Sequence, residues 1–348
     1  PVWNCAACPR CDQCGQHLVG VRAVKTEILK AIKEEAGFVS GQELCDRFGV
    51  SRTAVWKAIG QLKEEGFQIE AVRNKGYRLL SSDDVITEAE LMSNMEGGFI
   101  KKIVYYEETD STNIRARKLA EEGAPDGTLV VTDFQNAGRG RRGRMWVSPS
   151  GTGIFMSLIL RPDILPSSAS MLTLVAALAV YDGIKETTGL ETVIKWPNDI
   201  VAGGKKLCGI LTEMSAELEG IHYVVTGIGI NANMTEFPEE VGEAATSLRI
   251  LTGGPVRRSR LIAAVMKAYE GYYEKFKSCG SLAGLMDVYN EHMANLGREV
   301  KVLDPAGAYT GKALGIDEKG ELIVEKADGK VVRVVSGEVS VRGIYGYV

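Results

Sequence analysis

The densest cluster of chemically useful side chains lies between Gly138 and Arg144, which reads Gly-Arg-Gly-Arg-Arg-Gly-Arg. Four like charges repel one another, and three glycines lose more backbone entropy on ordering than other residues do. Such a stretch is either disordered or held by an anion. Apolar segments at 129–135 and 154–160 flank it and are typical of buried strands, which favours a folded phosphate-binding loop over a loose nucleic-acid tract.

A second cation follows at Lys195, which we expect at the end of a strand. Pro197 stiffens the turn that comes next, so the ammonium group has a fixed direction. A fixed lysine in the same chain as an arginine-rich loop suits a second contact to the same anion. Asn198 and Asp199 add oxygens that suit a nucleotide or Mg²⁺, although an Asx turn also explains them.

Two further stretches offer contacts to an uncharged part of a ligand. Ser111, Thr112 and Asn113 begin a predicted helix, where hydroxyl groups and free N–H groups form a small polar cluster. Helix capping explains Ser111 equally well. Gly227 and Gly229 alternate with isoleucines in a predicted strand and leave one face bare, which fits either a flat ligand or a bulge.

The reaction that suits fixed cations is one in which negative charge builds up on phosphate oxygens. The attack of a carboxylate on the α-phosphate of ATP is such a reaction, and its product is an acyl-adenylate. The sequence contains no Gly-x-x-x-x-Gly-Lys-Ser/Thr motif, which argues against a standard P-loop enzyme. His17, His222 and His292 lie outside every motif, so histidine-based proton relay is not expected.

Four cysteines at the start of the chain have a spacing that could bind zinc or an iron-sulfur cluster: Cys5, Cys8, Cys11 and Cys14. All of them lie within ten residues, whereas structural zinc sites join two separated pairs of ligands. We therefore favour a poorly ordered extension over residues 1–20 and predict no metal site there. The remaining cysteines, Cys45, Cys208 and Cys279, have apolar neighbours and are expected to be buried.

Residues 21–80 have the pattern of a winged helix-turn-helix. Ser40 and Ser51 are predicted to cap the second and third helices, and two short strands at 67–72 and 76–80 form the wing. DNA binding is favoured over a protein-binding module in which Trp56 is a core residue. The expected DNA-binding residues are Ser51, Arg52, Thr53, Trp56, Lys57, Arg73 and Lys75.

The charge distribution agrees with this placement. Residues 1–80 hold 12 Lys and Arg against 9 Asp and Glu, while the whole chain has a formal net charge of -4. The longest nearly apolar run, at 171–181, is too short to cross a bilayer, and the first residues lack an apolar signal region. We expect a cytoplasmic protein without a membrane partner.

The remaining chain predicts an α+β protein of three domains. After a linker at 81–87, the central domain at 88–295 combines strands with an apolar helix at 169–188 and amphipathic helices at 259–276 and 281–295. Residues 231–249 lack a strong period and are expected to order on binding. Short strands and turns at 296–348 predict a small SH3-like β-barrel.

The order of the motifs resembles that of the biotin protein ligases, over roughly residues 21–348. The matching stretches are Ser111-Thr112-Asn113, Gly138 to Arg144, Lys195-Trp196-Pro197-Asn198-Asp199, Lys206 to Leu211 and Gly227 to Asn231. With a winged helix in front, the chain is most similar to members that also repress the biotin operon. The cysteine-rich residues 1–20 depart from the family pattern.

The resemblance implies a role for each motif. It assigns Lys195, Arg139 and Arg141 to catalysis. The implied biotin-binding residues are Ser111, Thr112, Asn113, Gln135, Gly138, Gly209, Gly227 and Gly229. The implied ATP and adenylate contacts are Arg139, Arg141, Arg142, Arg144, Trp146, Asn198, Asp199 and Asn231.

The resemblance also implies substrates, partners and a fold. Biotin, ATP and Mg²⁺ would yield biotinyl-5'-AMP, and a lysine of biotin carboxyl carrier protein would then take the biotin. The family's catalytic domain is similar to class II aminoacyl-tRNA synthetases, and its repressors bind operator DNA as homodimers with bound adenylate. The alternatives are a lipoate-type acyl ligase of the same superfamily and a biotin-sensing transcription factor without catalysis.

Overall fold

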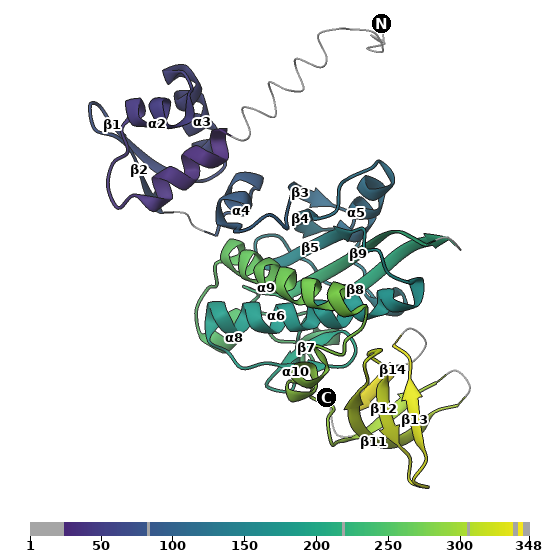
Figure 1. The fold of residues 1–348 in the computed structure, drawn as a ribbon. Coiled ribbons are helices and arrows are strands. Elements are labelled where there is room, and N and C mark those ends of the chain that lie inside the picture. Colours follow the sequence, from purple (N-terminus) through teal and green to yellow (C-terminus); the bar gives the residue numbers. More distant parts are fainter. Residues whose placement is uncertain (1–23, 82–83, 218–219, 305–306, 337–339, 344–348) are drawn as a thin grey trace, which may run out of the picture. The chain divides into compact units, whose positions relative to one another are not determined.

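The computed structural model describes residues 24–81, 84–217, 220–304, 307–336 and 340–343 (Figure 1). The cysteine cluster of the first twenty residues lies outside these ranges. Contacts divide the chain into two compact units, one up to Asn94 and one from Met95 onward. The second unit contains both the central sheet and the C-terminal sheet.

The first unit contains the predicted helix-turn-helix and wing. Its helices begin where the sequence predicts, because Ser40 Oγ accepts a hydrogen bond from Glu43 N and Ser51 Oγ accepts one from Ala54 N. Gly49 ends the first of these two helices with φ 63°. The elements are a helix over 24–34, α2 (Gly41–Phe48), α3 (Arg52–Glu64), and the antiparallel strands β1 (Gln68–Val72) and β2 (Gly76–Ser81).

Helix α4 (Glu88–Asn94) packs with this first unit, although its sequence position suggested the central domain. Ala89 belongs to the same apolar cluster as Ile28 and Leu62. Lys33 Nζ also lies 2.5 Å from Glu90 Oε2. The buried face of α4 therefore determines that this helix packs with the first unit. The polar residues that precede it do not mark the domain boundary.

A seven-stranded sheet forms the centre of the second unit, in the order β3-β4-β5-β9-β8-β7-β6. Only β3 and β4 run parallel, and α5 (Thr112–Glu121) connects them; every other neighbouring pair in this sheet is antiparallel. The strands are β3 (Lys102–Thr109), β4 (Thr128–Gln135), β5 (Gly153–Leu160), β6 (Val193–Lys195), β7 (Asp199–Ala202), β8 (Lys205–Glu217) and β9 (Gly220–Asn231).

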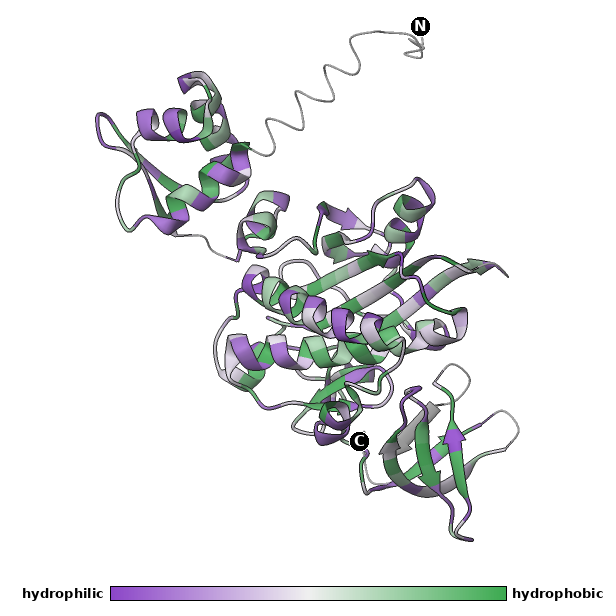
Figure 2. Ribbon diagram, viewed as in Figure 1, coloured by the Kyte–Doolittle hydropathy of each residue, from purple (hydrophilic) through white to green (hydrophobic). Residues whose placement is uncertain are grey.

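Two long helices, α6 (Leu172–Thr188) and α9 (Arg258–Cys279), pack side by side against the sheet (Figure 1). Their close approach depends on Gly183, where a Cβ atom would lie 2.5 Å from a Val265 methyl group. Figure 2 shows the hydrophobic residues concentrated on the sheet strands and on α6. Among the described residues, Pro166–Thr188 is the one helical segment long and apolar enough to cross a membrane, and 78% of its apolar 18-residue window is buried inside the protein.

The C-terminal sheet is antiparallel throughout and has the order β13-β12-β11-β10-β14. Its turn between β11 and β12 contacts the central domain, because Leu282 N donates to Glu318 O at 2.8 Å. The strands are β10 (Glu299–Leu303), β11 (Tyr309–Ile316), β12 (Leu322–Glu325), β13 (Val331–Val334) and β14 (Ser340–Gly343).

Four details differ from the sequence-based expectations. The helix predicted over 281–295 is shorter, and only α10 (Met286–Glu291) is helical. The segment at 231–249 contains the short helix α7 (Glu239–Gly242) and the first two residues of α8 (Leu248–Thr252). Strand β7 was not expected, and Cys279 is exposed whereas Cys45 and Cys208 are buried as predicted.

Candidate functional site

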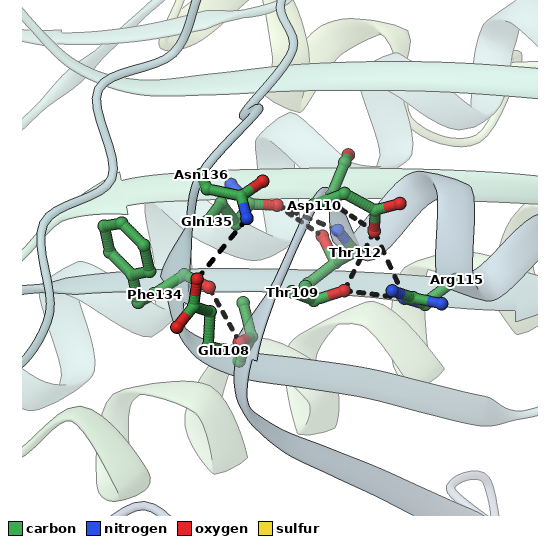
Figure 3. Close-up of polar contacts among 10 residues, drawn as sticks. Glu108, Thr109, Asp110, Thr112, Arg115, Phe134, Gln135 and Asn136 are labelled. Atoms are coloured by element: carbon green, nitrogen blue, oxygen red, sulfur yellow. Dashed lines mark hydrogen bonds and ion pairs between the residues drawn. The ribbon is translucent and has the colours of Figure 1, made fainter.

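A polar cluster forms where β4 ends and α5 begins (Figure 3). Thr112 donates to Gln135 Oε1 from both its backbone N, at 2.9 Å, and its Oγ1, at 3.2 Å. Gln135 Nε2 in turn donates to Ser148 Oγ at 3.0 Å. The end of a strand, the start of a helix and the segment after the arginine-rich loop therefore meet in one hydrogen-bonded group.

The capping role expected of Ser111 is not seen, because within the described residues its side chain makes no capping bond to α5. Asp110 organises this end instead: its Oδ1 accepts from Ser111 N at 2.8 Å and lies 3.1 Å from Arg115 Nε (Figure 3). Burial alone would raise the pKa of Asp110, but hydrogen bonds from Ser111 N and Thr109, together with the charge of Arg115, lower it. The Ser111 hydroxyl is thus left for other contacts.

A second polar group lies deeper and joins β5 and β8 to the same helix. Ser157 Oγ is 2.8 Å from Thr112 Oγ1 and 2.7 Å from Asn113 Oδ1. Asn113 Nδ2 donates to Glu213 Oε2 at 2.7 Å and to Leu211 O at 3.2 Å. Sequence reasoning missed Ser157 and Glu213, because a lone serine or glutamate in a strand carries no motif.

The bare face expected at the strand glycines is covered by side chains of the chain itself. A Cβ atom on Gly227 would lie 2.0 Å from Asn113 Oδ1. A Cβ atom on Gly229 or Gly209 would lie 2.8 or 2.9 Å from the Trp146 ring. These glycines therefore make room for an amide and a flat indole, and this steric need excludes the simpler explanation of a bulge.

The arginine-rich loop is folded, as its strand flanks predict. It contains a short 3₁₀ turn, Arg141–Gly143, with Arg142 at φ 59° and Gly143 at φ 71°. Arg141 Nη1 donates to Asn198 Oδ1 at 2.9 Å, and its Nη2 donates to the Ser336 carbonyl of the C-terminal sheet domain. Burial lowers the pKa of Arg141, and Arg142 and Arg144 lower it further, although the nearby Asp199 opposes them.

Lys195 lies at the end of β6 and is 7% exposed. The strand pairs with β7 so that Lys195 stands opposite Asp199, and Asn295 Oδ1 accepts from the next backbone N, of Trp196, at 2.9 Å. The backbone at Lys195 is therefore held by its pairing with β7 and, at the next residue, by a bond to the Asn295 side-chain amide. Asp199 Oδ1 also lies 2.6 Å from Lys206 Nζ.

A cavity of about 50 Å³ opens among these groups. The predicted site residues that line it are Ser111, Thr112, Asn113, Gln135, Arg139, Arg141, Trp146, Asn198, Gly209, Gly227 and Gly229. Lys206, Phe155, Ile210, Leu211 and Ile228 line it as well and were not assigned a role from sequence. Lys206 extends over the Trp146 ring, 5.4 Å from its centroid, and adds a cation to the site.

Six predicted residues are outside this lining, as far as the described residues define it: Gly138, Arg142, Arg144, Lys195, Asp199 and Asn231. Gly138 still lies next to this lining, since a Cβ atom added to it would be 3.1 Å from Gln135 Nε2. Asn231 Nδ2 donates to Thr246 O at 3.0 Å and so orders the 231–249 segment. Arg142 and Arg144 are exposed.

A separate basic surface lies on the first unit. All seven predicted DNA-binding residues are exposed, and Trp56 is 68% exposed, which excludes its role as a core residue. A cleft of about 450 Å³ between the wing and α2 is lined by Arg52, Arg73 and Lys75 among others. Arg52 Nη2 donates to Gln42 Oε1 at 2.8 Å, which holds the Arg52 guanidinium near the N-terminus of α3.

The described residues contain no group of three or more His, Cys, Asp or Glu side chains that could hold a metal ion. Asp199, whose charge raises the pKa of Arg141, is paired with Lys206.

A helix-turn-helix unit joined to an α+β domain with an arginine-lined cavity defines a class of protein in which a ligand site accompanies a helix-turn-helix module. Models of three families match the chain: the HTH domain over 24–78, the Biotin/lipoate A/B protein ligase family over 105–231 and the Biotin protein ligase C terminal domain over 296–342. Together they cover both sheets and the wing.

Known proteins of this type are similar over most of the chain. The Bifunctional ligase/repressor BirA of Bacillus subtilis is 41% identical over 87% of this chain and 93% of its own length. The biotin protein ligase of Aquifex aeolicus, solved in complex with biotin and ATP, is 36% identical with a TM-score of 0.62, and the match covers 70% of this chain and 99% of that one. The chain belongs to the biotin protein ligase family.

Proposed function

We propose that this chain is an ATP-dependent biotin protein ligase and a biotin-responsive repressor of biotin genes. The observation that carries the ligase proposal is one cavity lined by the Thr112–Gln135 group, by Arg139 and Arg141, and by the Trp146 indole. Polar, apolar and cationic groups in one cavity suit a ligand with a polar ring, an aliphatic chain and a carboxylate that meets a nucleotide. The names and bound ligands of the relatives support the same assignment.

In the first step, a carboxylate oxygen of biotin attacks the α-phosphorus of ATP, a phosphorus–oxygen bond forms, and pyrophosphate leaves. Thr112 and Gln135 would hold the ureido ring, and Ser111 lies beside them. Arg139 and Arg141 would neutralise charge on the phosphate oxygens, and Lys195 would contact the carboxylate and the transferring phosphate. The product is biotinyl-5'-AMP.

Mg²⁺ would enter this site with ATP. The ion usually keeps several waters and takes one or two carboxylates together with substrate phosphates. Asp199 is the carboxylate that could serve, with Asn198 beside it, provided that Lys206 turns toward the phosphates. The donor set therefore fits an ion carried by the nucleotide and does not fit a resident metal.

In the second step, a lysine amine of biotin carboxyl carrier protein attacks the acyl carbon, an amide forms, and AMP leaves. We further propose that the adenylate-bound protein dimerises and binds operator DNA through α3 and the wing, and that it acts in the cytoplasm. The winged helix supports the DNA contact, because its basic residues are exposed. We also propose that the central sheet is related to class II aminoacyl-tRNA synthetases and that the C-terminal sheet is an SH3-like barrel.

Pyrophosphate release tests the ligase proposal. Purified protein with ATP and Mg²⁺ should release pyrophosphate with biotin and should then label a biotin carboxyl carrier protein. Release with lipoate alone would identify a lipoate-type ligase. Biotin-dependent DNA binding without any pyrophosphate release would identify a sensor without catalysis.

A further inference from the structure

The hydrogen bonds of the inner polar group have only one consistent direction. Asn113 is held by Glu213 Oε2 at 2.7 Å and by the Leu211 carbonyl at 3.2 Å. A carboxylate and a carbonyl only accept hydrogen bonds, so the amide NH₂ group must point at them. The Asn113 Oδ1 atom is thereby turned toward Ser157, and Gly227 leaves the space that it occupies.

The position of Asn113 Oδ1 decides where the Ser157 proton goes. An amide oxygen has no hydrogen, so the 2.7 Å contact requires Ser157 to donate. Ser157 is fully buried and has a single hydroxyl hydrogen, which this bond uses. In its 2.8 Å contact with Thr112 Oγ1, Ser157 can therefore only accept.

The Thr112 hydroxyl hydrogen is consequently used inside the cluster. It points either to Ser157 Oγ at 2.8 Å or to Gln135 Oε1 at 3.2 Å. Gln135 Oε1 is the acceptor in that pair, because the Thr112 backbone N also donates to it while Gln135 Nε2 faces Ser148. Toward the cavity, Thr112 Oγ1 can offer lone pairs and no hydrogen.

We propose that Glu213 and Ser157 are positioning residues that fix Thr112 as a hydrogen-bond acceptor, so that the pocket selects a ligand presenting an N–H group at that point. This inference rests on the proposed function and deepens it. A cyclic urea supplies the N–H group, whereas a dithiolane ring does not. An unpaired buried acceptor costs free energy, so a ring without N–H is rejected by desolvation as well as by the lost bond.

Titration calorimetry with the full chain tests the proposal. The ligands are biotin and two analogues, each with a methyl group on one ureido nitrogen. Wild-type protein should bind at least one analogue at least about 10-fold more weakly than biotin, since a tenfold change corresponds to roughly 1.4 kcal/mol. Ser157→Ala and Glu213→Ala should each weaken biotin binding roughly 10-fold and reduce that discrimination.

Three further measurements separate positioning from a merely structural role. Glu213→Gln should restore biotin affinity, because its amide oxygen accepts the same bond from Asn113. The matched control is Glu217→Ala, since Glu217 is an exposed carboxylate of the same strand, 3.5 Å from His222. In both alanine variants, pyrophosphate release should show a raised KM for biotin with kcat changed less than about threefold, because Ser157 and Glu213 contact Thr112 and Asn113 and are not among the groups proposed to contact the phosphate.

Unchanged biotin affinity in both alanine variants would overturn the inference, as would equal loss in Glu213→Gln and Glu213→Ala. If Ser157→Ala fails to fold, the comparison of Glu213→Ala with Glu213→Gln decides alone, because the Glu213 side chain is partly exposed. Absence of biotin binding by the wild-type protein would instead refute the proposed function, so the two failures are distinguishable.

Discussion

Lys195 is a nearly buried cation at the end of β6, and its neighbours leave it little freedom. We predict that Lys195→Met reduces pyrophosphate release about 100-fold or more, because removing one preorganised charge contact from a transition state has costs of that order. Methionine keeps the aliphatic volume, so the melting temperature should change little. Single-turnover adenylate formation measures the effect.

The control for this variant is Lys205→Met, which removes an exposed lysine from β8. It should leave adenylate formation at the wild-type rate. If Lys195→Met is as active as Lys205→Met, the assignment of Lys195 to the phosphate is wrong.

Gly229 is one of the two strand glycines that leave room for the Trp146 ring. Gly229→Ala would place a methyl group 2.8 Å from the indole, closer than real Cβ contacts. We predict at least a tenfold loss of biotin affinity, which corresponds to roughly 1.4 kcal/mol. Gly271→Ala is the matched control, because its Cβ meets nothing within 4 Å and alanine favours the helix; calorimetry that finds both variants alike would contradict the prediction.

Sequence reasoning located the strand glycines but not the side chains that occupy the space beside them. The Asn113 amide of α5 and the Trp146 indole, which follows the arginine-rich loop, reach Gly227 and Gly229 only because the sheet brings β5, β8 and β9 together. The contact of Lys206 was missed although the residue belongs to a recognised motif. Only the folded structure brings its ammonium group over the Trp146 ring.

Asp133 and Arg258 join β4 to α9 through a partly buried ion pair of 2.7 Å. Asp133 also accepts hydrogen bonds from Ser150 and Gly151, and Arg258 donates to Gly153 O at 3.0 Å. These contacts hold the end of the segment that follows the arginine-rich loop. Within the loop itself, Gly140 N donates to Arg144 O at 2.7 Å.

This ion pair predicts an acid-sensitive contribution to stability. Burial would raise the pKa of Asp133, but the bonds from Ser150, Arg258 and Gly151 lower it below the usual value. A depressed pKa stabilises the fold fully above the unfolded-state pKa of about 4, and that contribution is lost as pH falls toward the folded-state pKa. Chemical denaturation at pH 7 and pH 3 should show a smaller loss for Asp133→Asn than for wild type; equal losses would contradict the argument.

The exposed basic residues of the wing predict a contact with DNA. Arg73→Ala and Lys75→Ala should weaken binding to a duplex from the promoter region of the gene that encodes this chain. Each should reduce the salt dependence of the binding constant by about one counterion per lost contact. Lys30→Ala is the control, because Lys30 is exposed on the first helix outside the cleft. Fluorescence anisotropy at several salt concentrations measures the slopes, and an unchanged slope for all three variants would exclude the wing from the interface.

Helix boundaries show what local sequence can and cannot predict. Ser40, Ser51 and Gly49 mark helix ends through short-range bonds, and the structure confirms them. Helix α10 ends early for a distant reason: Ile194 N donates to His292 O and Ala294 N donates to Ile194 O, so β6 draws the chain out of the helix. No periodicity in 281–295 contains that information.

At the scale of the whole chain, the order of winged helix, ligase domain and C-terminal sheet could be predicted from sequence, because each carries its own pattern. Family matches over 24–78, 105–231 and 296–342 confirm that order. The contacts between the C-terminal sheet and the site could not be predicted. Trp196 Nε1 donates to Gly320 O at 3.0 Å, and Arg141 donates to Ser336 O, so residues far apart in sequence flank Lys195 and the arginine-rich loop.

The position of Trp146 also gives the protein an optical reporter of its own. Of the tryptophans in the described ranges, Trp56 is 68% exposed and Trp196 is 1% exposed, whereas Trp146 is half-buried beneath the Lys206 ammonium at the cavity wall. Indole emission depends on nearby charge and on solvent, so biotin should change the intrinsic fluorescence through Trp146. We predict that Trp146→Phe abolishes this signal while Trp56→Phe preserves it, which would let binding be followed in real time without a label.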